Sequence, residues 1–221
     1  MNPAALFDAL TIGVQLTGAL GSAGRSEIHL FSYLACLLAL YETKPVTEWG
    51  YSFAGTQDGS PFSPELNDAI DSLVRTGSLT AKSEAGDFFI VEKTGAQEHA
   101  DLRGIESLAL RERYLEGACS SLLSIPIGRI RMGLQKEPSL AQVAPGRAPR
   151  PLLEGIAYDE LYVQLEALHQ SLGNVVTDLL VPAVVWLSYL AKNAERPVSE
   201  SRADIGDQSS EDHASEVNHD G

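Results

Sequence analysis

The longest apolar run in the chain predicts a central core helix. Residues 28–41, IHLFSYLACLLALY, are hydrophobic on nearly every side of a helix, and a helix without a polar face packs inside a protein. Ser26 is placed to cap its start, and Glu27 would complement the positive end of the helix dipole. Pro45 ends the segment, because proline cannot continue a helix.

Two further apolar stretches are expected to be helical. Residues 3–20 space their large side chains as a helix does, but Gly13 and Gly18 weaken that helix by roughly 1 kcal/mol each relative to Ala, so it needs something to pack on. Residues 158–191 predict one long helix, kinked near Pro182. Its most apolar part, VVTDLLVPAVVWLSYLA, is shorter than the roughly 20 residues that span a bilayer, so we expect a buried or partner-facing helix and no membrane association.

Between the core helix and residue 77, the pattern predicts an extended segment followed by an amphipathic helix. Alternation with small residues predicts the extended segment at three aromatic residues, Trp49, Tyr51 and Phe53. Ser63 is an N-cap candidate, Pro64 fits the first helical position, and Gly77 is placed to end the helix. The apolar face between these signals consists of Leu66, Ile70, Leu73 and Val74.

Two short strand-like runs follow this helix. Residues 79–82 and 88–92 are joined by residues 83–87, which include a glycine, so they predict a β-hairpin. The resulting order is helix, extended segment, helix and hairpin. This is the order of a winged helix, in which the hairpin is the wing and residues 65–76 take the position of the recognition helix.

The second half of the chain is expected to be helical. Residues 104–123 predict a helix that residues 125–134 continue after a proline. Residues 136–151 contain four prolines and predict a linker or an extended arm. The sequence therefore predicts a mainly α protein with a small β-hairpin: a winged-helix-like domain at 1–95, then a helical region at 96–193 that contains this Pro-rich basic linker.

The charge of the chain is strongly acidic. Its 221 residues include 30 acidic and 16 basic ones, a net charge of −14, so only a local patch could contact nucleic acid. The apolar fraction of 44% is that of a globular protein, which excludes collagen-like, mucin-like and fully disordered classes. Residues 194–221 carry −6 without apolar periodicity. We expect a solvated, disordered acidic tail; the alternative is an electrostatic arm that competes with nucleic acid for a basic surface.

The sequence contains no recognisable catalytic motif. The glycine-rich stretch GALGSAG lacks a preceding strand and a following Lys-Ser/Thr, so it is a weak phosphate-loop candidate. Cys36 and Cys119 lie in apolar stretches and are interpreted as small buried hydrophobes, and His29 is interpreted as structural. We therefore expect no catalytic residue, no metal and no cofactor. The start of the chain lacks a positive region and is interrupted by Asp8, which favours a cytoplasmic protein over a secreted one.

One segment departs from the acidic character of the chain. Residues 125–151 contain five basic residues against Glu137 alone, a local charge of five minus one, or +4. Such side chains can contact phosphates from flexible segments. Contact with a partner protein, an ordinary solvated surface and contact with nucleic acid all remain open for these candidates, which are Arg129, Arg131, Lys136, Arg147 and Arg150.

The predicted recognition helix has the wrong charge for reading DNA. Its polar positions include Glu65, Asn67, Asp68 and Asp71, and Arg75 comes only at its far end. A helix in the major groove needs donors and cations near the phosphates. A winged helix with an acidic third helix is therefore expected to be a protein-interaction module, whose contact with DNA is indirect.

Residues 26–92 resemble a known family. The apolar helix, the aromatic segment WGYSF, the turn into PFSPEL and the helix that leads into a hairpin resemble the middle components of bacterial ABC-three-component defence systems, which include the Lamassu-type small subunit. The motif is of limited specificity, since similar passages occur in Panacea-type antitoxins and other small winged-helix proteins of bacterial conflict systems. Outside these residues the resemblance extends only to length and helical character.

The resemblance implies a non-catalytic winged-helix adaptor in an antiphage or anti-plasmid complex. Such an adaptor links an SMC-like ABC ATPase to an effector such as a nuclease, and the family offers no catalytic residues to carry over. The alternative is a winged-helix DNA-binding regulator or an antitoxin-like protein. Two unusually apolar stretches could dock on each other, on a second copy or on the ATPase, and their candidate partner-facing residues are Leu6, Leu10, Val14, Val184, Trp186 and Leu187.

Overall fold

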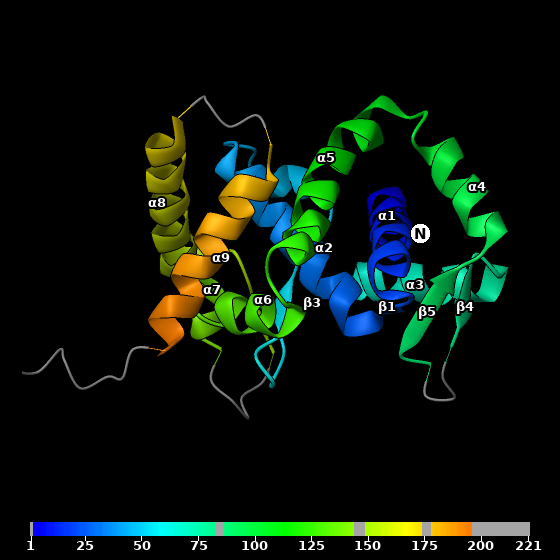
Figure 1. Cartoon of the computed structure of the whole chain (residues 1–221), viewed down its shortest axis with the longest axis horizontal. Helices are drawn as coiled ribbons and strands as arrows, with labels where there is room; N and C mark the ends of the chain where they lie inside the picture. The colour runs from blue at the N-terminus through cyan, green and yellow to red at the C-terminus, as the bar shows by residue number, and fades with distance from the viewer. Residues whose placement is uncertain (1, 83–85, 144–148, 174–177, 196–221) are drawn as a thin grey trace, which may run out of the picture.

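The protein is described by a computed structural model that covers residues 2–82, 86–143, 149–173 and 178–195 (Figure 1). It is mostly helical with two small sheets, which confirms the mainly α prediction. The helices are α1 (Pro3–Leu20), α2 (Arg25–Tyr41), α3 (Pro64–Thr76), α4 (Lys93–Leu102), α5 (Glu106–Ser120), α6 (Ile127–Leu134), α7 (Pro138–Ala141), α8 (Gly155–Leu172) and α9 (Leu180–Glu195), with 3-10 turns at Val46–Trp49 and Ser121–Leu123. The strands are β1 (Ala23–Gly24), β2 (Ala54–Gly55), β3 (Pro61–Phe62), β4 (Leu79–Ala81), β5 (Phe88–Val91) and β6 (Arg150–Pro151).

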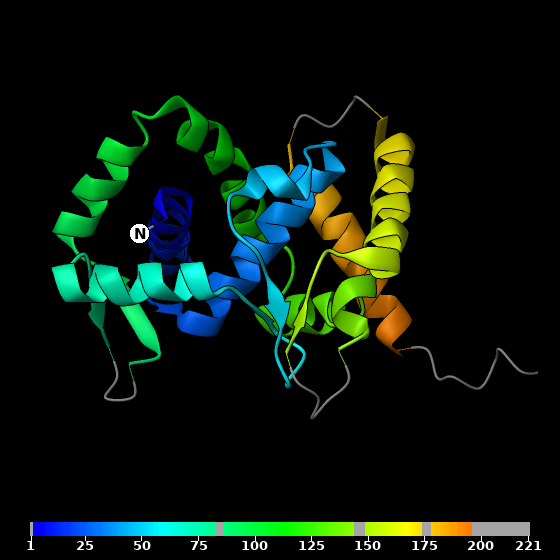
Figure 2. The ribbon, with the colours of Figure 1, turned by 180° about the vertical axis from the view of Figure 1, so that it is seen from behind.

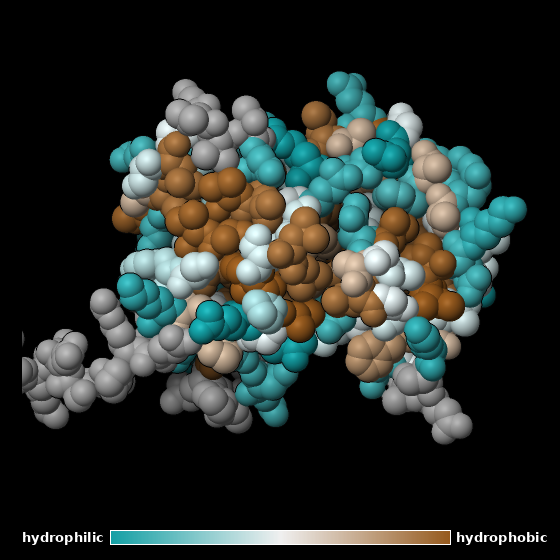
Figure 3. All heavy atoms as spheres, in the orientation of Figure 1, coloured by the Kyte–Doolittle hydropathy of each residue, from teal (hydrophilic) through white to brown (hydrophobic). Residues whose placement is uncertain are grey.

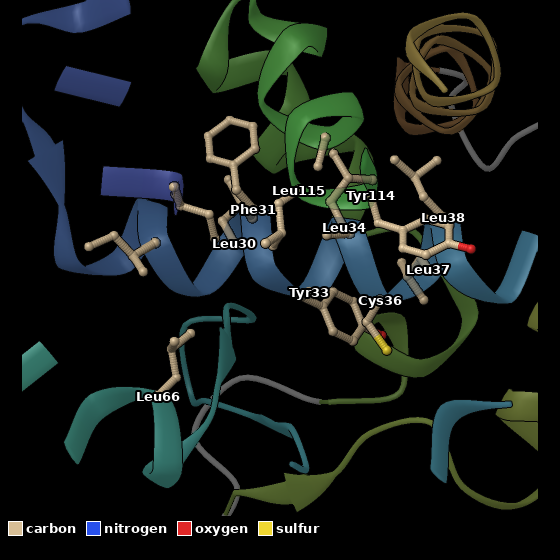
Figure 4. Close-up of a cluster of buried hydrophobic side chains, with 14 of the residues drawn as sticks. Leu30, Phe31, Tyr33, Leu34, Cys36, Leu37, Leu38, Leu66, Tyr114 and Leu115 are labelled. Carbon is tan, nitrogen blue, oxygen red and sulfur yellow. The ribbon is translucent and has the colours of Figure 1, made fainter. Parts of the chain in front are cut away.

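The predicted core helix is α2, and every residue from Ile28 to Tyr41 is buried. It packs against α5, α1 and α8. Figure 4 shows how its faces are divided: Phe31 and Leu34 point toward Leu115 of α5, whereas Tyr33 and Cys36 point to the opposite side. A helix with apolar residues all round is thus covered on all sides, as its sequence requires.

The start of α2 corrects one prediction. The N-cap residue is Gly24, not Ser26, which lies inside the first turn. Gly24 pairs with Phe88 of β5, and this pairing holds it in the extended conformation that precedes a helix. The carboxylate of Glu27 accepts the N–H of Gly24 at 2.9 Å, so Glu27 does serve the positive end of the helix.

The predicted hairpin is formed by β4 and β5, and β1 joins it. The strand order is β1-β5-β4, and all pairs are antiparallel. Before it, α3 begins and ends as expected: the Ser63 hydroxyl accepts the N–H of Leu66 at 3.3 Å, Pro64 is the first helical residue, and Gly77 adopts a left-handed φ of 75°. Seen from behind, α3 lies across the surface with the hairpin at one end (Figure 2).

The aromatic segment is less extended than its alternation suggests. Trp49 ends a 3-10 turn, and strand β2 begins only at Ala54. Trp49, Tyr51 and Phe53 are nevertheless all buried, whereas Gly50 and Ser52 between them are exposed. The alternation therefore does separate an inner from an outer face. Strand β2 pairs with β3 on one side and with β6 on the other.

The region after residue 92 differs from its prediction in three places. Helix α4 was not expected, because its sequence has no apolar face and Gly95 is its one buried residue. Residues 136–151 are not a free linker where the structure describes them: α7 is buried and β6 pairs with β2. The predicted helix over 158–191 is two helices, since α8 ends at Gly173 with a φ of 61° and Pro182 lies in the first turn of α9, where proline is tolerated.

One hydrophobic cluster joins the two halves of the chain. It contains residues of α1 and α2 together with residues of α5, α8 and α9, and the expected boundary at residue 95 falls inside α4. Among the described helices, α1 alone has the length and composition to cross a membrane, but it is mostly buried in this cluster, as a core helix is. The expected tail at 194–221 lies outside the described residues beyond Glu195.

Candidate interaction surfaces

Four of the five predicted basic residues belong to described segments, which are α6 with the residues that follow it and strand β6, next to the β2–β3 turn. Arg129 and Arg131 are on α6, Lys136 follows it, and Arg150 is in β6 opposite Gly55. Gln135, at the end of α6, donates a hydrogen bond to the Asp58 carbonyl in the turn at 3.2 Å, so α6 and the small sheet are adjacent. Arg129, Lys136 and Arg150 are exposed and Arg131 is half-buried. Arg147 lies outside the described residues.

Glu137, the one acidic residue in the sequence sum for this basic segment, does not lie on the surface. Glu137 is fully buried, and its carboxylate accepts the hydroxyl of Tyr33 at 2.7 Å and the backbone N–H of Ser139 at 2.9 Å, besides that of Leu140. Burial raises the pKa of Glu137 to about 7. Because Glu137 is buried, the exposed part of residues 125–143 and 149–151 is more basic than the sequence sum suggests.

The predicted partner-facing apolar residues lie mainly inside the chain. Leu6, Leu10, Trp186 and Leu187 are at most 7% exposed and belong to the core cluster, and Val14 and Val184 are half-buried. The two stretches pack on other parts of the chain, since α1 lies on α5 and α3 and α9 lies on α6. The two stretches are therefore apolar because they form part of the core of this chain.

A different set of apolar residues on α9 faces outward. Val181, Val185 and Tyr189 are 40%, 41% and 54% exposed, and their spacing of four residues places them on one face of the helix. Leu123 is 79% exposed in the 3-10 turn that packs against α9. Figure 3 shows apolar residues gathered over α8 and α9 on this side of the molecule. We call Leu123, Val181, Val185 and Tyr189 the α9 patch. The sequence does not reveal this patch, because residues on every side of α9 are apolar. Only the burial of Trp186 and Leu187 in the structure shows which face of the helix points outward.

The outward face of α3 is acidic, as predicted. Asp68 and Asp71 are exposed, and Glu65 and Asn67 are half-buried. The Arg25 guanidinium binds this face, donating to the Asn67 side-chain oxygen at 2.7 Å and to the Asp71 carboxylate at 2.8 Å. The exposed cation of the helix, Arg75, comes one residue before its end. This face is poorly suited to phosphates.

Two buried polar clusters were not foreseen. In the first, Arg111 binds Asp8 at 2.6 Å, and the Tyr51 hydroxyl donates to the same carboxylate. In the second, His99 meets Thr11 and Glu112. The Thr11 hydroxyl is 2.9 Å from His99 Nε2, and a Glu112 oxygen is 3.7 Å from the same nitrogen.

The second cluster does not have the geometry of a catalytic triad. A histidine that activates a hydroxyl uses one ring nitrogen for the hydroxyl and the other for the acid, whereas Thr11 and Glu112 share Nε2. Thr11 is also only 1% exposed. Burial lowers the pKa of His99 although Glu112 opposes this shift, so the neutral imidazole is a packing partner for the hydroxyl of Thr11 and for the stacked ring of Phe7.

The cysteine prediction is confirmed: Cys36 and Cys119 are buried and unbonded, and burial raises the pKa of both thiols. Within the described residues, His, Cys, Asp and Glu side chains form no group of three or more that could hold a metal ion. Comparison with known proteins finds no matching family model, no matching curated protein and no matching solved structure.

Proposed function

We propose that this protein is a non-catalytic, cytoplasmic adaptor subunit that links an SMC-like ABC ATPase to a nuclease-type effector in a defence complex. The α9 patch is the observation that carries the proposal, because three apolar side chains on one helix face and a neighbouring leucine are left uncovered by the described part of the chain. Uncovered apolar surface of this kind marks protein contacts. The ATPase and the effector are the partners that the family resemblance implies.

The arrangement of the N-terminal elements supports a winged-helix-like module as the base of this adaptor. Helices α2 and α3 are followed directly by the β4–β5 hairpin, and β1 adds a third strand to it. The position of the recognition helix is taken by α3, whose outward carboxylates Asp68 and Asp71 oppose a phosphate backbone. A module of this charge is better suited to a protein surface than to the DNA major groove.

Co-expression with the products of the neighbouring reading frames tests the proposal. The complex is separated by size-exclusion chromatography and its mass is measured, and we expect co-elution with a large coiled-coil ATPase. Val185→Asp with Tyr189→Asp should abolish co-elution while the free energy of unfolding stays unchanged, because both side chains are exposed. Leu110→Asp, which likewise replaces an exposed apolar side chain by a carboxylate, is the matched control, because Leu110 is 64% exposed on α5. A chain that elutes alone beside its neighbours' products rules the adaptor out.

A second candidate function is a DNA-binding regulator or antitoxin-like protein. The observation that favours it is the group of basic residues around the β2–β3 turn, which Glu137 does not offset at the surface. Binding of this kind would be driven by phosphate contacts and would depend steeply on salt.

A further inference from the structure

A cavity of about 460 Å³ lies at the N-terminus of α2. The β2–β3 turn forms one wall of it and the start of β5 forms another. Polar, charged and aromatic side chains share its lining, and those that bear on its chemistry are Arg25, His29, Asp58, Phe62, Asp87 and Phe88. Neither the adaptor function nor the α9 patch makes use of this cavity.

The lining of this cavity includes an unused hydrogen-bond donor. His29 is only 2% exposed, and its Nδ1 accepts the backbone N–H of Ser63 at 3.2 Å. Burial, with Arg25 nearby, lowers the pKa of His29 to about 4, so the ring is neutral near pH 7 and carries its proton on Nε2. Nε2 is buried and has no partner in the described chain. Because an unpaired buried donor is costly, this N–H calls for an acceptor.

The rim of the cavity is negatively charged. Asp58 accepts hydrogen bonds from the hydroxyls of Thr56 and Ser60, and these bonds lower its pKa, so this carboxylate is ionised. Asp87 provides a second exposed carboxylate. Two negative charges at one opening favour a cation.

Positive charges do not cancel this acidity. Of the described residues that line the cavity, Arg25 alone is basic, and the basic residues of α6 and β6 near the β2–β3 turn are not part of the lining. The guanidinium of Arg25 is bound to Asn67 and Asp71 on α3. The positive end of the α2 dipole is met by Glu27, whose carboxylate accepts the N–H of Gly24. An anion would therefore meet the two rim carboxylates, whereas a cation would meet partners.

The aromatic lining narrows the class of cation. The ring of Phe62 packs on the ring of His29, with 4.8 Å between the two ring centroids, and Phe88 is 45% exposed. A planar guanidinium stacks on aromatic faces and matches carboxylates through its fork of donors. A lysine ammonium lacks both the plane and the fork.

We propose that this cavity binds an arginine side chain of an extended peptide, with the guanidinium between Asp58 and Asp87 and a neighbouring peptide carbonyl on His29 Nε2. The evidence for the arginine site is the chemistry of the residues that line the cavity. Only the identity of the peptide, as a basic segment of an assembly partner, rests on the proposed function.

The probe that tests the site is N-acetyl-arginine N-methylamide, titrated into the full chain labelled with nitrogen-15 at histidine. We expect the Nε2–H resonance of His29 to shift with saturation, and the affinity to fall as salt rises. The citrulline analogue has the same shape without the charge, and it should bind at least about tenfold more weakly. Equal binding of both analogues, or saturation without a change at His29, overturns the proposal, as does the absence of any binding.

Matched variants distinguish binding at this cavity from non-specific attraction of the probe to an acidic protein. Asp58→Asn with Asp87→Asn should weaken the arginine probe about tenfold or more. Asp68→Asn with Asp159→Asn, which removes the same charge from exposed positions outside the cavity, should change the affinity less than about twofold. Equal losses from both pairs would mean non-specific attraction and reject the site. The probe needs no partner protein, so failure of co-elution and failure of this titration are distinct outcomes.

Discussion

Arg111 of α5 donates two hydrogen bonds to the carboxylate of Asp8 in α1, from Nε to Oδ1 at 2.6 Å and from Nη2 to Oδ2 at 2.7 Å. Asp8 is fully buried, and the guanidinium lies 3.6 Å from the ring centroid of Trp49. Burial alone would lower the pKa of Arg111, but Asp8 raises it above its ordinary value. The pair joins segments 103 positions apart, so it ties the first helix to the second half of the chain.

Arg111→Met should lower the free energy of unfolding by about 3–5 kcal/mol, because it leaves the Asp8 carboxylate buried without a counter-charge. Urea denaturation followed by circular dichroism measures the loss. The matched control is Arg113→Met, two residues along the same helix, which removes a half-exposed ion pair with Glu42 and should cost about 0–1 kcal/mol. If the two variants lose the same stability, the buried pair has no special weight.

Local signals predicted the elements whose ends are set by a few neighbouring residues. Ser63, Pro64 and Gly77 were read directly, because capping and the left-handed φ at a helix end depend on those residues alone. The long apolar helix was predicted for a similar reason. The start of α2 was misplaced because it depends on strand pairing with Phe88, which is distant in sequence.

The candidate sites depend on contacts between distant segments, which no local pattern reveals. Glu137 was counted as a surface charge, and only the tertiary position of Tyr33 shows that it is buried. Val185 and Trp186 are both apolar, and the packing of α9 on α6 decides that the first is exposed and the second is not. The cavity at His29 likewise forms from three separate parts of the chain.

Glu137 should make the protein less stable as the pH rises. Its pKa is raised by burial from 4.5 to about 7, so between these values the folded state binds a proton that the unfolded state has released. The contribution of Glu137 to the free energy of unfolding should therefore fall from pH 4.5 to pH 7 by on the order of 3 kcal/mol and level off above that. His29 contributes in the opposite direction, because burial lowers its pKa from 6.5 to about 4 and the folded state gains stability as the pH rises between these values. Urea melts at several pH values measure this slope.

Glu137→Gln should remove the contribution of Glu137, because its amide does not titrate, and leave the rise in stability with pH that His29 contributes. The amide meets one backbone N–H less well than the carboxylate does. Exposed Glu160→Gln on α8 is the control that should keep the slope. A Glu137→Gln variant with the parental slope would show that another group titrates.

Gly117→Ala should lower the free energy of unfolding by about 1–3 kcal/mol. A Cβ at this position of α5 would lie 2.6 Å from the Cβ of Leu179, which precedes α9, so the two segments would have to separate. Gly128→Ala on α6 meets nothing within 4 Å and should leave stability unchanged or raise it by up to about 1 kcal/mol. Thermal melts of both variants check the contrast, and a neutral Gly117→Ala would contradict the close approach.

Reversing the charge of the basic residues around the β2–β3 turn tests the DNA-binding alternative. Arg129→Glu, Arg131→Glu, Lys136→Glu and Arg150→Glu together should abolish any salt-dependent binding of duplex DNA and flatten its dependence on salt, because these cations would supply the phosphate contacts. Fluorescence anisotropy with labelled duplex at a series of salt concentrations gives both quantities. Lys44→Glu, Arg75→Glu, Lys82→Glu and Lys93→Glu together, which reverse the same number of charges at exposed positions of other segments, control for net charge. If the parental chain binds DNA and the reversed chain binds it equally, the basic residues are not the contact surface. If the parental chain shows no salt-sensitive binding at all, the regulator alternative is excluded and the same four residues become candidates for an acidic surface on a partner protein.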